Sequence, residues 1–528
     1  MPSPRLTSTL RFALSSRRTL AVSCLSFASG LPIGLVWISI PDWMRDAGVD
    51  IRIVGLTTLA HAPWSFKMLW APLLDRYPLP GMGRRRGWIA VSQIVLIALT
   101  LLLGWVTRHP ETPWVILSLC FAIALASASQ DIVVDAYAVD VLRPEEQGVA
   151  VGVRTAMYRT AMYVSGGLSI SLLAWFSWKI VAVGLALLYL PCLWVTRRAP
   201  EPEIESPRPP SLREAVWLPF LGFLSRHRAL EILAFVVLYK LADNLAESLL
   251  RPFLVDMGYS NLDRGVGLTT IGTIMTVVGT ILGGALTAVW GLGHCLWIFG
   301  FLQIFSNFGY VLVAESAVDL PLMYAAMSFE NATKGMGMGA FGVLLIRMTQ
   351  RRFSATQYAL FSSLFVIPRL VSGPVTGMMV YALGWTPFFW FTMLMGVPGL
   401  LMLARFVPPG TREPSFAVEP PKHRAPLSPA SLWIRAAGGA AAGFALSVVA
   451  LAILRGLEPI RKGGEFEFVA PLLALLAPET LPAALRLAGA SVAAIVCGLL
   501  TAAVCAARRG MGADGVDPEA AEDARTGR

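Results

Sequence analysis

The sequence predicts an all-α polytopic membrane protein, and three observations support this fold class. Of its 528 residues, 55% are hydrophobic and only 14% are charged, with a mean hydropathy of +0.64, whereas soluble domains carry about 25% charged residues. Apolar runs of the roughly 20 residues that a membrane helix needs recur along the chain. Ionisable residues lie deep inside several of these runs, which indicates a pathway for a transported solute.

The apolar runs predict about fourteen spans, arranged as two six-helix halves plus two extra C-terminal transmembrane helices. The first half has spans near residues 19–40, 51–74, 87–107, 113–138, 148–173 and 179–196. The second half has spans near residues 229–255, 265–290, 293–314, 320–346, 356–383 and 386–406. The final pair lies near residues 432–454 and 482–506.

Polar, Pro-rich segments mark the boundaries between these groups. At the N-terminus, Arg17 and Arg18 precede an apolar stretch without a clear cleavage site, so we interpret it as a membrane helix and not as a cleaved signal. The predicted parts are a six-helix bundle over 1–196, a cytoplasmic linker over 197–228, a second six-helix bundle over 229–407, a linker over 408–431, two additional transmembrane helices over 432–507 and a cytoplasmic tail over 508–528.

The distribution of Lys and Arg predicts the orientation in the membrane. The loops near Glu315 and Trp385 have no basic residue, and of the loops on their side only 455–462 is rich in them. We therefore expect a bacterial inner-membrane protein with both termini in the cytoplasm. The loops that this places in the cytoplasm include the basic groups Arg17–Arg18, Arg84–Arg86, Arg197–Arg198, Arg351–Arg352 and Arg508–Arg509.

The composition disfavours several other classes of protein. The net charge of +10 is spread over short segments between apolar runs, so we expect no nucleic-acid partner. The six cysteines are scattered singly, which fits neither disulfide nor zinc spacing. The sequence has no phosphate-binding loop and no nucleophile elbow. We expect no metal, no cofactor and no enzymatic activity, a proton gradient as the energy source, and a monomer in the lipid bilayer.

In the seventh predicted span, Lys240, Asp243, Asn244 and Glu247 follow i, i+3, i+4, i+7 spacing and share one helix face. An ionisable group at mid-membrane costs about 2.5–3.5 kcal/mol, so it faces a partner or a water-filled cavity. We expect this stripe to line a central cavity, with Glu247 as a candidate proton site and the others as candidates for binding cargo. A Lys–Asp pair that only fixes helix packing is the alternative.

The tenth span carries a second set of polar residues near mid-depth. Glu330 and Lys334 are one helical turn apart. Glu330 is a candidate for proton coupling, while Lys334 and Asn331 are candidates for binding cargo. An internal Glu330–Lys334 ion pair is the alternative.

The fourth span carries Gln130, Asp131 and Asp135 in its cytoplasmic half, with both aspartates on one face. A carboxylate in an apolar setting favours its neutral form, so it is able to exchange a proton at physiological pH. Asp131 and Asp135 are therefore candidates for proton coupling, and Gln130 for binding cargo. Alternatively, Arg154 and Arg159 of the fifth span neutralise these carboxylates as a structural clamp.

Arg159 and Arg369 lie in corresponding spans of the two halves. Arginine forms bidentate bonds with carboxylates and keeps its charge, so both are candidates for holding an anionic cargo, with helix packing as the alternative. His61 in the second span is a further candidate for the pathway, although a lone histidine is more often a packing residue.

Six spans, a linker and six spans is the layout of the major facilitator superfamily, and five segments resemble one family within it. The five segments are FASGLPIGLVWISIPDWM (Phe27–Met44), FKMLWAPLLDRY (Phe66–Tyr77), GRRRGW (Gly83–Trp88), SASQDIVVDAYAVDVL (Ser127–Leu142) and YRTAMYVSGGL (Tyr158–Leu168). They resemble the AmpG muropeptide permeases, strongly over about 1–200 and more thinly over 225–407.

The resemblance implies proton-driven uptake of GlcNAc-1,6-anhydroMurNAc and its peptides from periplasm to cytoplasm for peptidoglycan recycling. It also implies a link to β-lactamase induction, and so to antibiotic resistance, where the host has that circuit. The acidic residues of the family's fourth span correspond to Asp131 and Asp135. Muropeptides carry carboxylates that Arg and Lys side chains bind, and hydroxyls suited to Asn244, Gln130 and Asn331.

The segment between the second and third spans also resembles the cytoplasmic signature of the superfamily. That signature is a conformational latch and not a substrate site. Its members here are Asp75, Arg76, Gly83, Arg84, Arg85 and Arg86.

Two departures from the family pattern keep other functions open. Val134 and the stretch Ala136–Val139 differ from the bulkier, more charged residues expected there, and the loop between the eighth and ninth spans lacks a second signature. A related permease for another anionic cargo, such as an acyl-CoA ester or a siderophore, is one alternative. A membrane-embedded sensor or enzyme is a more remote one.

Overall fold

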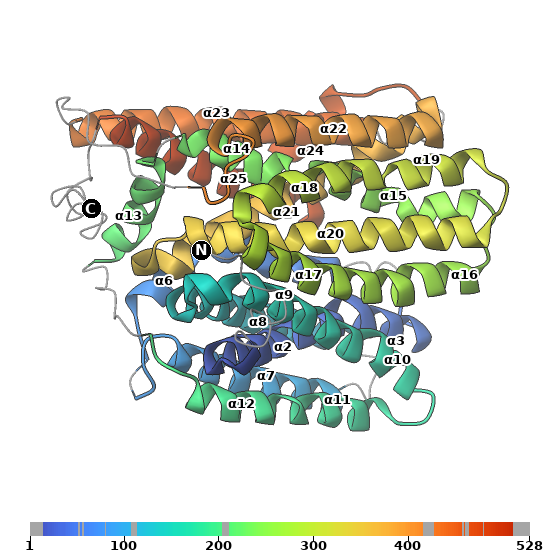
Figure 1. Cartoon of the computed structure of the whole chain (residues 1–528). Coiled ribbons are helices and arrows are strands. Elements are labelled where there is room, and N and C mark those ends of the chain that lie inside the picture. The colour runs from blue at the N-terminus through green and yellow to red at the C-terminus, as the bar shows by residue number, and fades with distance from the viewer. Residues whose placement is uncertain are drawn as a thin grey trace.

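The computed structural model describes residues 14–50, 53–54, 57–79, 81–106, 113–202, 211–226, 228–414, 427–456, 459, 464–478 and 480–509. The regular secondary structure of these residues is helical throughout. The helices run side by side as one long bundle, with the N-terminal half in blue to teal below the C-terminal half in green to orange (Figure 1).

The N-terminal half is built from six helical passes, several of them made of consecutive pieces. The first contains α2 (Arg17–Gly34), η1 (Leu35–Ser39) and α3 (Ile40–Asp46), and the second contains η2 (Thr57–His61), α5 (Ala62–Phe66), η3 (Lys67–Leu69) and α6 (Ala71–Arg76). The other four are α7 (Arg86–Val106); α8 (Pro113–Val141); α9 (Pro144–Tyr163) with η4 (Val164–Leu168) and α10 (Ser169–Leu172); and α11 (Trp178–Leu187) with α12 (Tyr189–Arg198).

The C-terminal half repeats this plan. Its first three passes are α14 (Ala229–Leu238) with α15 (Leu241–Asp256); α16 (Asn261–Gly265) with η5 (Val266–Ile271) and α17 (Gly272–Trp290); and α18 (Leu292–Ser306) with α19 (Phe308–Glu315). The other three are α20 (Leu320–Met348), η6 (Arg351–Phe353) with α21 (Ser354–Leu383), and α22 (Trp385–Phe406).

Three further elements follow the C-terminal half, and one helix lies within the linker between the halves. The last elements are α23 (Pro429–Gly456), α24 (Val469–Leu476) and α25 (Leu481–Ala507). The linker predicted over 197–228 contains α13 (Leu212–Leu224), a helix that sequence reasoning did not anticipate. It packs against α6, α21 and α25, so it touches both halves and the added helices.

The all-helical fold agrees with the prediction, but the number of spans is established only in part. Nine helices of the described residues are long and apolar enough to cross a bilayer. They cover the predicted first, third, fourth, sixth, eighth, ninth and twelfth spans and the C-terminal pair. The described residues of the other five predicted spans are helical as well. The count of fourteen and the domain boundaries therefore stay predictions.

Breaks in the helices place polar residues inside the bundle. Pro63 and Pro72 lie at the starts of α5 and α6, where proline is tolerated but cannot continue a preceding helix. The second pass is therefore a series of short pieces, and Lys67 lies in one of them, η3. In the seventh pass the break between α14 and α15 makes Lys240 the N-cap of α15.

The two halves meet most closely where α9 crosses α17. A Cβ atom on Gly148 of α9 would lie 2.5 Å from the carbonyl oxygen of Gly284, and one on Gly152 would lie 2.9 Å from that of Thr280. Small residues let membrane helices approach to backbone contact. An apolar cluster that includes Val151 of α9 and Phe341 of α20 continues the contact between the halves.

One end of the bundle is rich in arginine, and it is called the basic end below. It lies on the left in Figure 1, where α2, α7 and α9 begin and where α6, α8 and α12 end. Arg17, Arg84–Arg86, Arg143 and Arg197–Arg198 belong to it.

Candidate functional site

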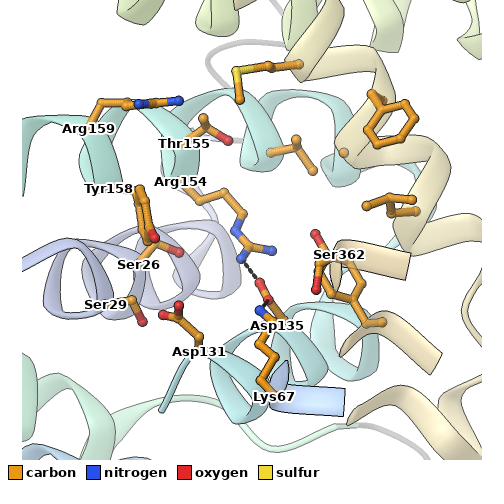
Figure 2. Close-up of a pocket in the computed structure, with 16 residues that line it drawn as sticks. Ser26, Ser29, Lys67, Asp131, Asp135, Arg154, Thr155, Tyr158, Arg159 and Ser362 are labelled. Atoms are coloured by element: carbon orange, nitrogen blue, oxygen red, sulfur yellow. Dashed lines mark hydrogen bonds and ion pairs between the residues drawn. The ribbon is translucent and has the colours of Figure 1, made fainter. Parts of the chain in front are cut away.

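A cavity of about 230 Å³ lies between the two halves (Figure 2). Its wall is formed by α2, η3, α8 and α9 of the N-terminal half together with α20 and α21 of the C-terminal half. Five ionisable side chains other than tyrosine line it, and all five come from the N-terminal half: Lys67, Asp131, Asp135, Arg154 and Arg159.

Of the two aspartates in this group, Asp135 is the one that forms ion pairs with nearby cations. Lys67 Nζ lies 3.4 Å from Asp135 Oδ2, and Arg154 forms an ion pair and a hydrogen bond with Asp135 Oδ1 (Figure 2). The three charges come from η3, α8 and α9, so they also tie three elements together. Of the two arginines considered as a clamp, Arg154 is the one that binds an aspartate.

Asp131 lies one turn away on the same face of α8, and its surroundings differ. Its side chain is buried, with 8% of its surface exposed, and it lies beside Ser29 of α2. Within the described residues, no Lys or Arg forms an ion pair with it. The neighbouring Gln130 donates from Nε2 to Ser29 Oγ over 3.3 Å, while its Oε1 is buried without a hydrogen-bond partner among the described residues.

Arg159 is the cation of the cavity wall that has no acidic partner within the described part of the chain. It lies on α9, one turn beyond Thr155 and next to Tyr158 (Figure 2). Arg369, its predicted counterpart, lies on α21, but its side chain is outside the described residues.

The stripe predicted to line a central cavity lies inside the C-terminal half, apart from the residues that line the cavity of Figure 2. Lys240 Nζ lies 2.9 Å from Asp243 Oδ2 and also bonds Gln303 Oε1 of α18. Both charged side chains are buried. This is the packing pair that was weighed as the alternative. Asn244 belongs to the same face, and its Nδ2 is buried without a hydrogen-bond partner among the described residues.

The charges of α20 find partners on other helices instead of pairing with each other. Lys334 Nζ lies 2.7 Å from Glu247 Oε2 of α15. Glu330 is buried and accepts a hydrogen bond from Tyr310 Oη over 3.3 Å. Asn331 is satisfied, since its Nδ2 donates to Met327 O over 2.9 Å and its Oδ1 accepts from Thr276 Oγ1 over 3.1 Å.

His61 does not line the cavity. Its ring lies 4.5 Å from the ring of Trp37, centroid to centroid, and Trp37 in turn meets Trp64 edge-on. This aromatic setting matches the packing role that is usual for a lone histidine.

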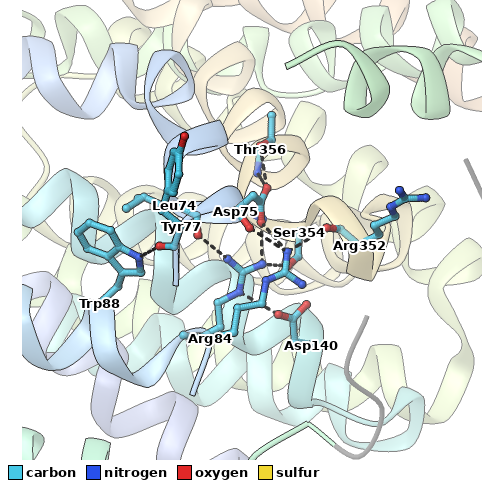
Figure 3. Close-up of polar contacts among 11 residues, drawn as sticks. Leu74, Asp75, Tyr77, Arg84, Trp88, Asp140, Arg352, Ser354 and Thr356 are labelled. Carbon is cyan, nitrogen blue, oxygen red and sulfur yellow. Dashed lines mark hydrogen bonds and ion pairs between the residues drawn. The ribbon is translucent and has the colours of Figure 1, made fainter. Parts of the chain in front are cut away.

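At the basic end, Asp75 of α6 joins the two halves (Figure 3). Its carboxylate accepts hydrogen bonds from the backbone N–H of Ala355 and of Thr356 over 3.3 and 2.8 Å, and from Thr356 Oγ1 over 2.7 Å. These donors form the first turn of α21, where unpaired N–H groups and the helix dipole favour a negative charge. Asp75 is fully buried.

The neighbouring arginines surround this carboxylate. Arg85 Nη2 lies 2.7 Å from both Asp75 Oδ1 and Ser354 Oγ, and Arg85 Nε lies 3.0 Å from Asp140 Oδ2. Burial works to lower the pKa of the Arg85 guanidinium, but the Asp140 and Asp75 carboxylates outweigh burial, so this pKa is raised above its ordinary value. Arg84 Nη2 donates to the carbonyl of Arg352 over 3.0 Å, a further bond between the halves.

The remaining signature residues have contacts within their own half or with the start of the linker that follows it. Arg86 ion-pairs with Glu201 and donates to Ala199 O over 3.0 Å. The Arg76 guanidinium lies 5.3 Å from the centre of the Tyr77 ring. Gly83 has φ +73°, a backbone conformation that favours glycine, so it sets the turn that presents the arginines.

Comparison with known proteins identifies the family. The model of the Major Facilitator Superfamily matches residues 22–372. The chain belongs to the major facilitator superfamily. Among solved structures, the proton:xylose symporter XylE is a similar facilitator, with a TM-score of 0.56 at 12% identity over 76% of this chain and 97% of that one, which supports the shared fold.

Two curated relatives extend the comparison within the facilitators. The anhydromuropeptide permease of Escherichia coli (strain K12) is 40% identical over 388 residues, which are 73% of this chain and 79% of the relative. A putative transporter named AmpG 4 of Rickettsia felis is 26% identical over 397 residues, 73% of this chain and 95% of the relative. The predicted resemblance to the AmpG family is therefore confirmed.

Several residues of this facilitator were not anticipated from the sequence. Lys67 was within a quoted motif but was not singled out, although a lysine inside an apolar run is the same signal that identified Lys240. Ser354 and Thr356 at the start of α21 were missed too, because their role depends on the approach of α6. Tyr158 and Tyr358, which line the cavity, gave no signal distinct from packing.

The Asp75 contacts of this facilitator predict how its basic end opens. In Asp75→Asn, the α21 N-terminus loses its charged partner, so the closed state should lose about 2 kcal/mol, roughly 30-fold in population. We expect Ser362→Cys, in a background without the natural cysteines, to react faster with an impermeant maleimide added at the basic end. Thr356→Ser, which keeps the hydroxyl, is the control. Equal labelling rates with and without Asp75→Asn would contradict this role.

Proposed function

We propose that this facilitator is a proton-driven permease that imports anhydro-muropeptides, GlcNAc-1,6-anhydroMurNAc and its peptides, for peptidoglycan recycling. The observation that carries the proposal is the cavity between the halves, where Asp131 has no cation partner and Arg159 no acidic partner among the described residues. The Escherichia coli relative, whose name states its cargo, supports the choice of substrate. In hosts with an induction circuit, the same import would supply the signal for β-lactamase.

In the proposed mechanism, the two aspartates of α8 have different tasks. Asp135 is held between Lys67 and Arg154, so it fixes the wall of the cavity. Asp131 has no such cation and is buried beside Ser29, which favours exchange between its neutral and charged forms. We assign proton coupling to Asp131 on this difference.

Cargo recognition is assigned to the cavity wall on the grounds of charge and hydrogen bonding. Arg159 offers a planar, permanently charged group to a cargo carboxylate. The hydroxyls of Ser26, Thr155 and Ser362 offer partners for sugar hydroxyls. Gln130, a predicted candidate for binding cargo, is fully buried and is not among the residues that line this cavity. At about 230 Å³, the cavity is smaller than the roughly 300–1,000 Å³ of typical ligand sites, so binding requires the halves to separate.

Alternating access would proceed by opening and closing the basic end. The excess of Arg and Lys assigns this end, with both termini, to the cytoplasm. The bonds of Asp75 and Arg84 to α21 and η6 then hold the cytoplasmic side closed, and their release would admit the cargo to the cytoplasm. This rocking of one half against the other is the general mode of inverted-repeat transporters.

Uptake of labelled anhydro-muropeptide into proteoliposomes tests the proposed function. We expect accumulation when a proton gradient is imposed in the direction of uptake, and equilibration only when an ionophore collapses the gradient. Absence of uptake by a folded, membrane-inserted chain would defeat the muropeptide assignment. Uptake of an acyl-CoA ester or a siderophore in its place would favour the alternative anionic cargo.

Asp131→Asn should abolish accumulation while leaving counterflow intact, because the amide hydrogen-bonds like the neutral acid but cannot release a proton. With a gradient imposed, accumulation of cargo by Asp131→Asn should fall to about the level that is measured without a gradient. Counterflow in preloaded proteoliposomes measures the cargo pathway alone. Asp46→Asn, at an exposed position, is the matched control. Full accumulation by Asp131→Asn would remove Asp131 from the coupling mechanism.

Arg159→Gln should raise the KM for anhydro-muropeptide by about 10- to 100-fold, the effect of losing a charge-assisted hydrogen bond. Arg159→Lys should give an intermediate KM, since lysine keeps the charge but cannot form the bidentate bonds of a guanidinium group. Arg45→Gln, an exposed arginine of the same half, should leave the KM unchanged. A KM for Arg159→Gln within twofold of the unchanged chain would show that Arg159 only packs.

A further inference from the structure

An ion pair in the C-terminal half differs from the buried charge pairs around it. Lys334 of α20 and Glu247 of α15 are joined by a 2.7 Å contact, and their side chains are 14% and 44% exposed. The buried Lys240–Asp243 pair of the same half is 3% and 7% exposed. In the Lys334–Glu247 pair, the lysine is therefore partly buried and the glutamate is exposed.

Helix geometry places Lys334 on the continuation of the cavity wall. Met338, Gly342 and Leu345 of α20 line the cavity between the halves. Lys334 precedes Met338 by four residues, so it lies on the same helix face, about 6 Å farther from the basic end. A cargo that enters from the opposite end would pass Lys334 before it reaches the cavity.

Three carboxylates face Lys334, and two of them are engaged elsewhere. The three are Glu247, Glu330 and Asp243. Asp243 is bound by Lys240 over 2.9 Å, and Glu330 accepts a hydrogen bond from Tyr310 over 3.3 Å. Glu247 is the carboxylate that forms the ion pair with Lys334, and it is also the most exposed of the three.

We propose that Lys334 is a binding site for a carboxylate of the cargo peptide and that Glu247 occupies this site while the transporter is empty. This inference rests on the proposed function and adds a second anion site, in the half opposite Arg159. When a cargo carboxylate arrives, it replaces Glu247 at Lys334, and the Glu247 side chain, which is 44% exposed, turns away from the lysine. Two sites on opposite halves would let one acidic peptide bridge them.

The exchange costs little free energy because Lys334 keeps a carboxylate partner in both states. Removing one member of a partly buried ion pair is costly, since it leaves the other charge uncompensated. Replacing one carboxylate by another avoids that cost. Cargo affinity is then a competition, so loss of Glu247 should strengthen binding and loss of Lys334 should weaken it. A purely structural pair predicts that both losses are harmful.

The test compares two cargoes in proteoliposomes of the full chain. One is labelled anhydro-muropeptide, and the other is the same molecule with its peptide carboxyl groups converted to amides. For the acidic cargo, we expect Glu247→Gln to lower the KM and Lys334→Gln to raise it, each by about tenfold, the effect of gaining or losing a charge-assisted bond. For the amidated cargo, both variants should match the unchanged chain.

Conservative variants and a matched control keep the test decisive if a charge-removing variant fails to fold. Lys334→Arg should retain the KM for the acidic cargo, and Glu247→Asp, which is shorter, should lower it in the same direction as Glu247→Gln. Glu231→Gln removes a carboxylate from an ion pair on the surface of the same half and should leave the KM for both cargoes unchanged.

The outcomes separate this inference from the proposed function. Uptake by the unchanged chain tests the proposed function alone. Given that uptake, a rise in KM for both Glu247→Gln and Glu247→Asp would overturn the inference. Equal effects of Lys334→Gln on the acidic and the amidated cargo would overturn it too. Opposite effects of the Glu247 and Lys334 substitutions, confined to the acidic cargo, would establish it.

Discussion

Compensation of charge inside apolar helices is the constraint on which the rest of the structure depends. A lone charge at mid-membrane costs about 2.5–3.5 kcal/mol, and apolar helices in lipid have no hydrophobic force to hold them in register. The ion pairs of Asp135 with Lys67 and Arg154 meet both needs, since they satisfy the carboxylate and fix η3, α8 and α9 relative to one another. The bonds of Lys240 to Asp243 and Gln303 do the same between α15 and α18.

The same constraint explains why contacts between the halves differ from contacts within them. In the proposed transport cycle, a pair inside one half would persist, whereas a pair between the halves would break. Asp75 is bonded to Thr356 of α21, while Arg85 binds Asp75 and Asp140 within the N-terminal half. Separation of the halves would therefore leave the Arg85, Asp75 and Asp140 charges together on one side.

Much of the fold was predictable, because apolar runs and the positions of charges along a helix are properties of the sequence. Asp131 and Asp135 share the cavity wall, as their spacing on one helix face predicted. The broken second pass and helix α13 were not predictable from hydropathy. The division of the predicted span 51–74 into short helices depends on where Pro63 and Pro72 fall relative to its neighbours, and α13 depends on the surfaces of α6, α21 and α25.

Charge partners were the least predictable feature, and the packing of α20 shows why. Glu330 and Lys334 are one turn apart, so sequence spacing alone allows them to pair. The rotation of α20 is set by Gly335 and Gly339, whose faces lie against the backbone of α17 near Thr276 and Thr280. Lys334 precedes Gly335 by one residue and is turned by about 100° from that contact. It therefore points away from α17 and meets Glu247 of α15, a partner 87 residues distant that only the assembled bundle supplies.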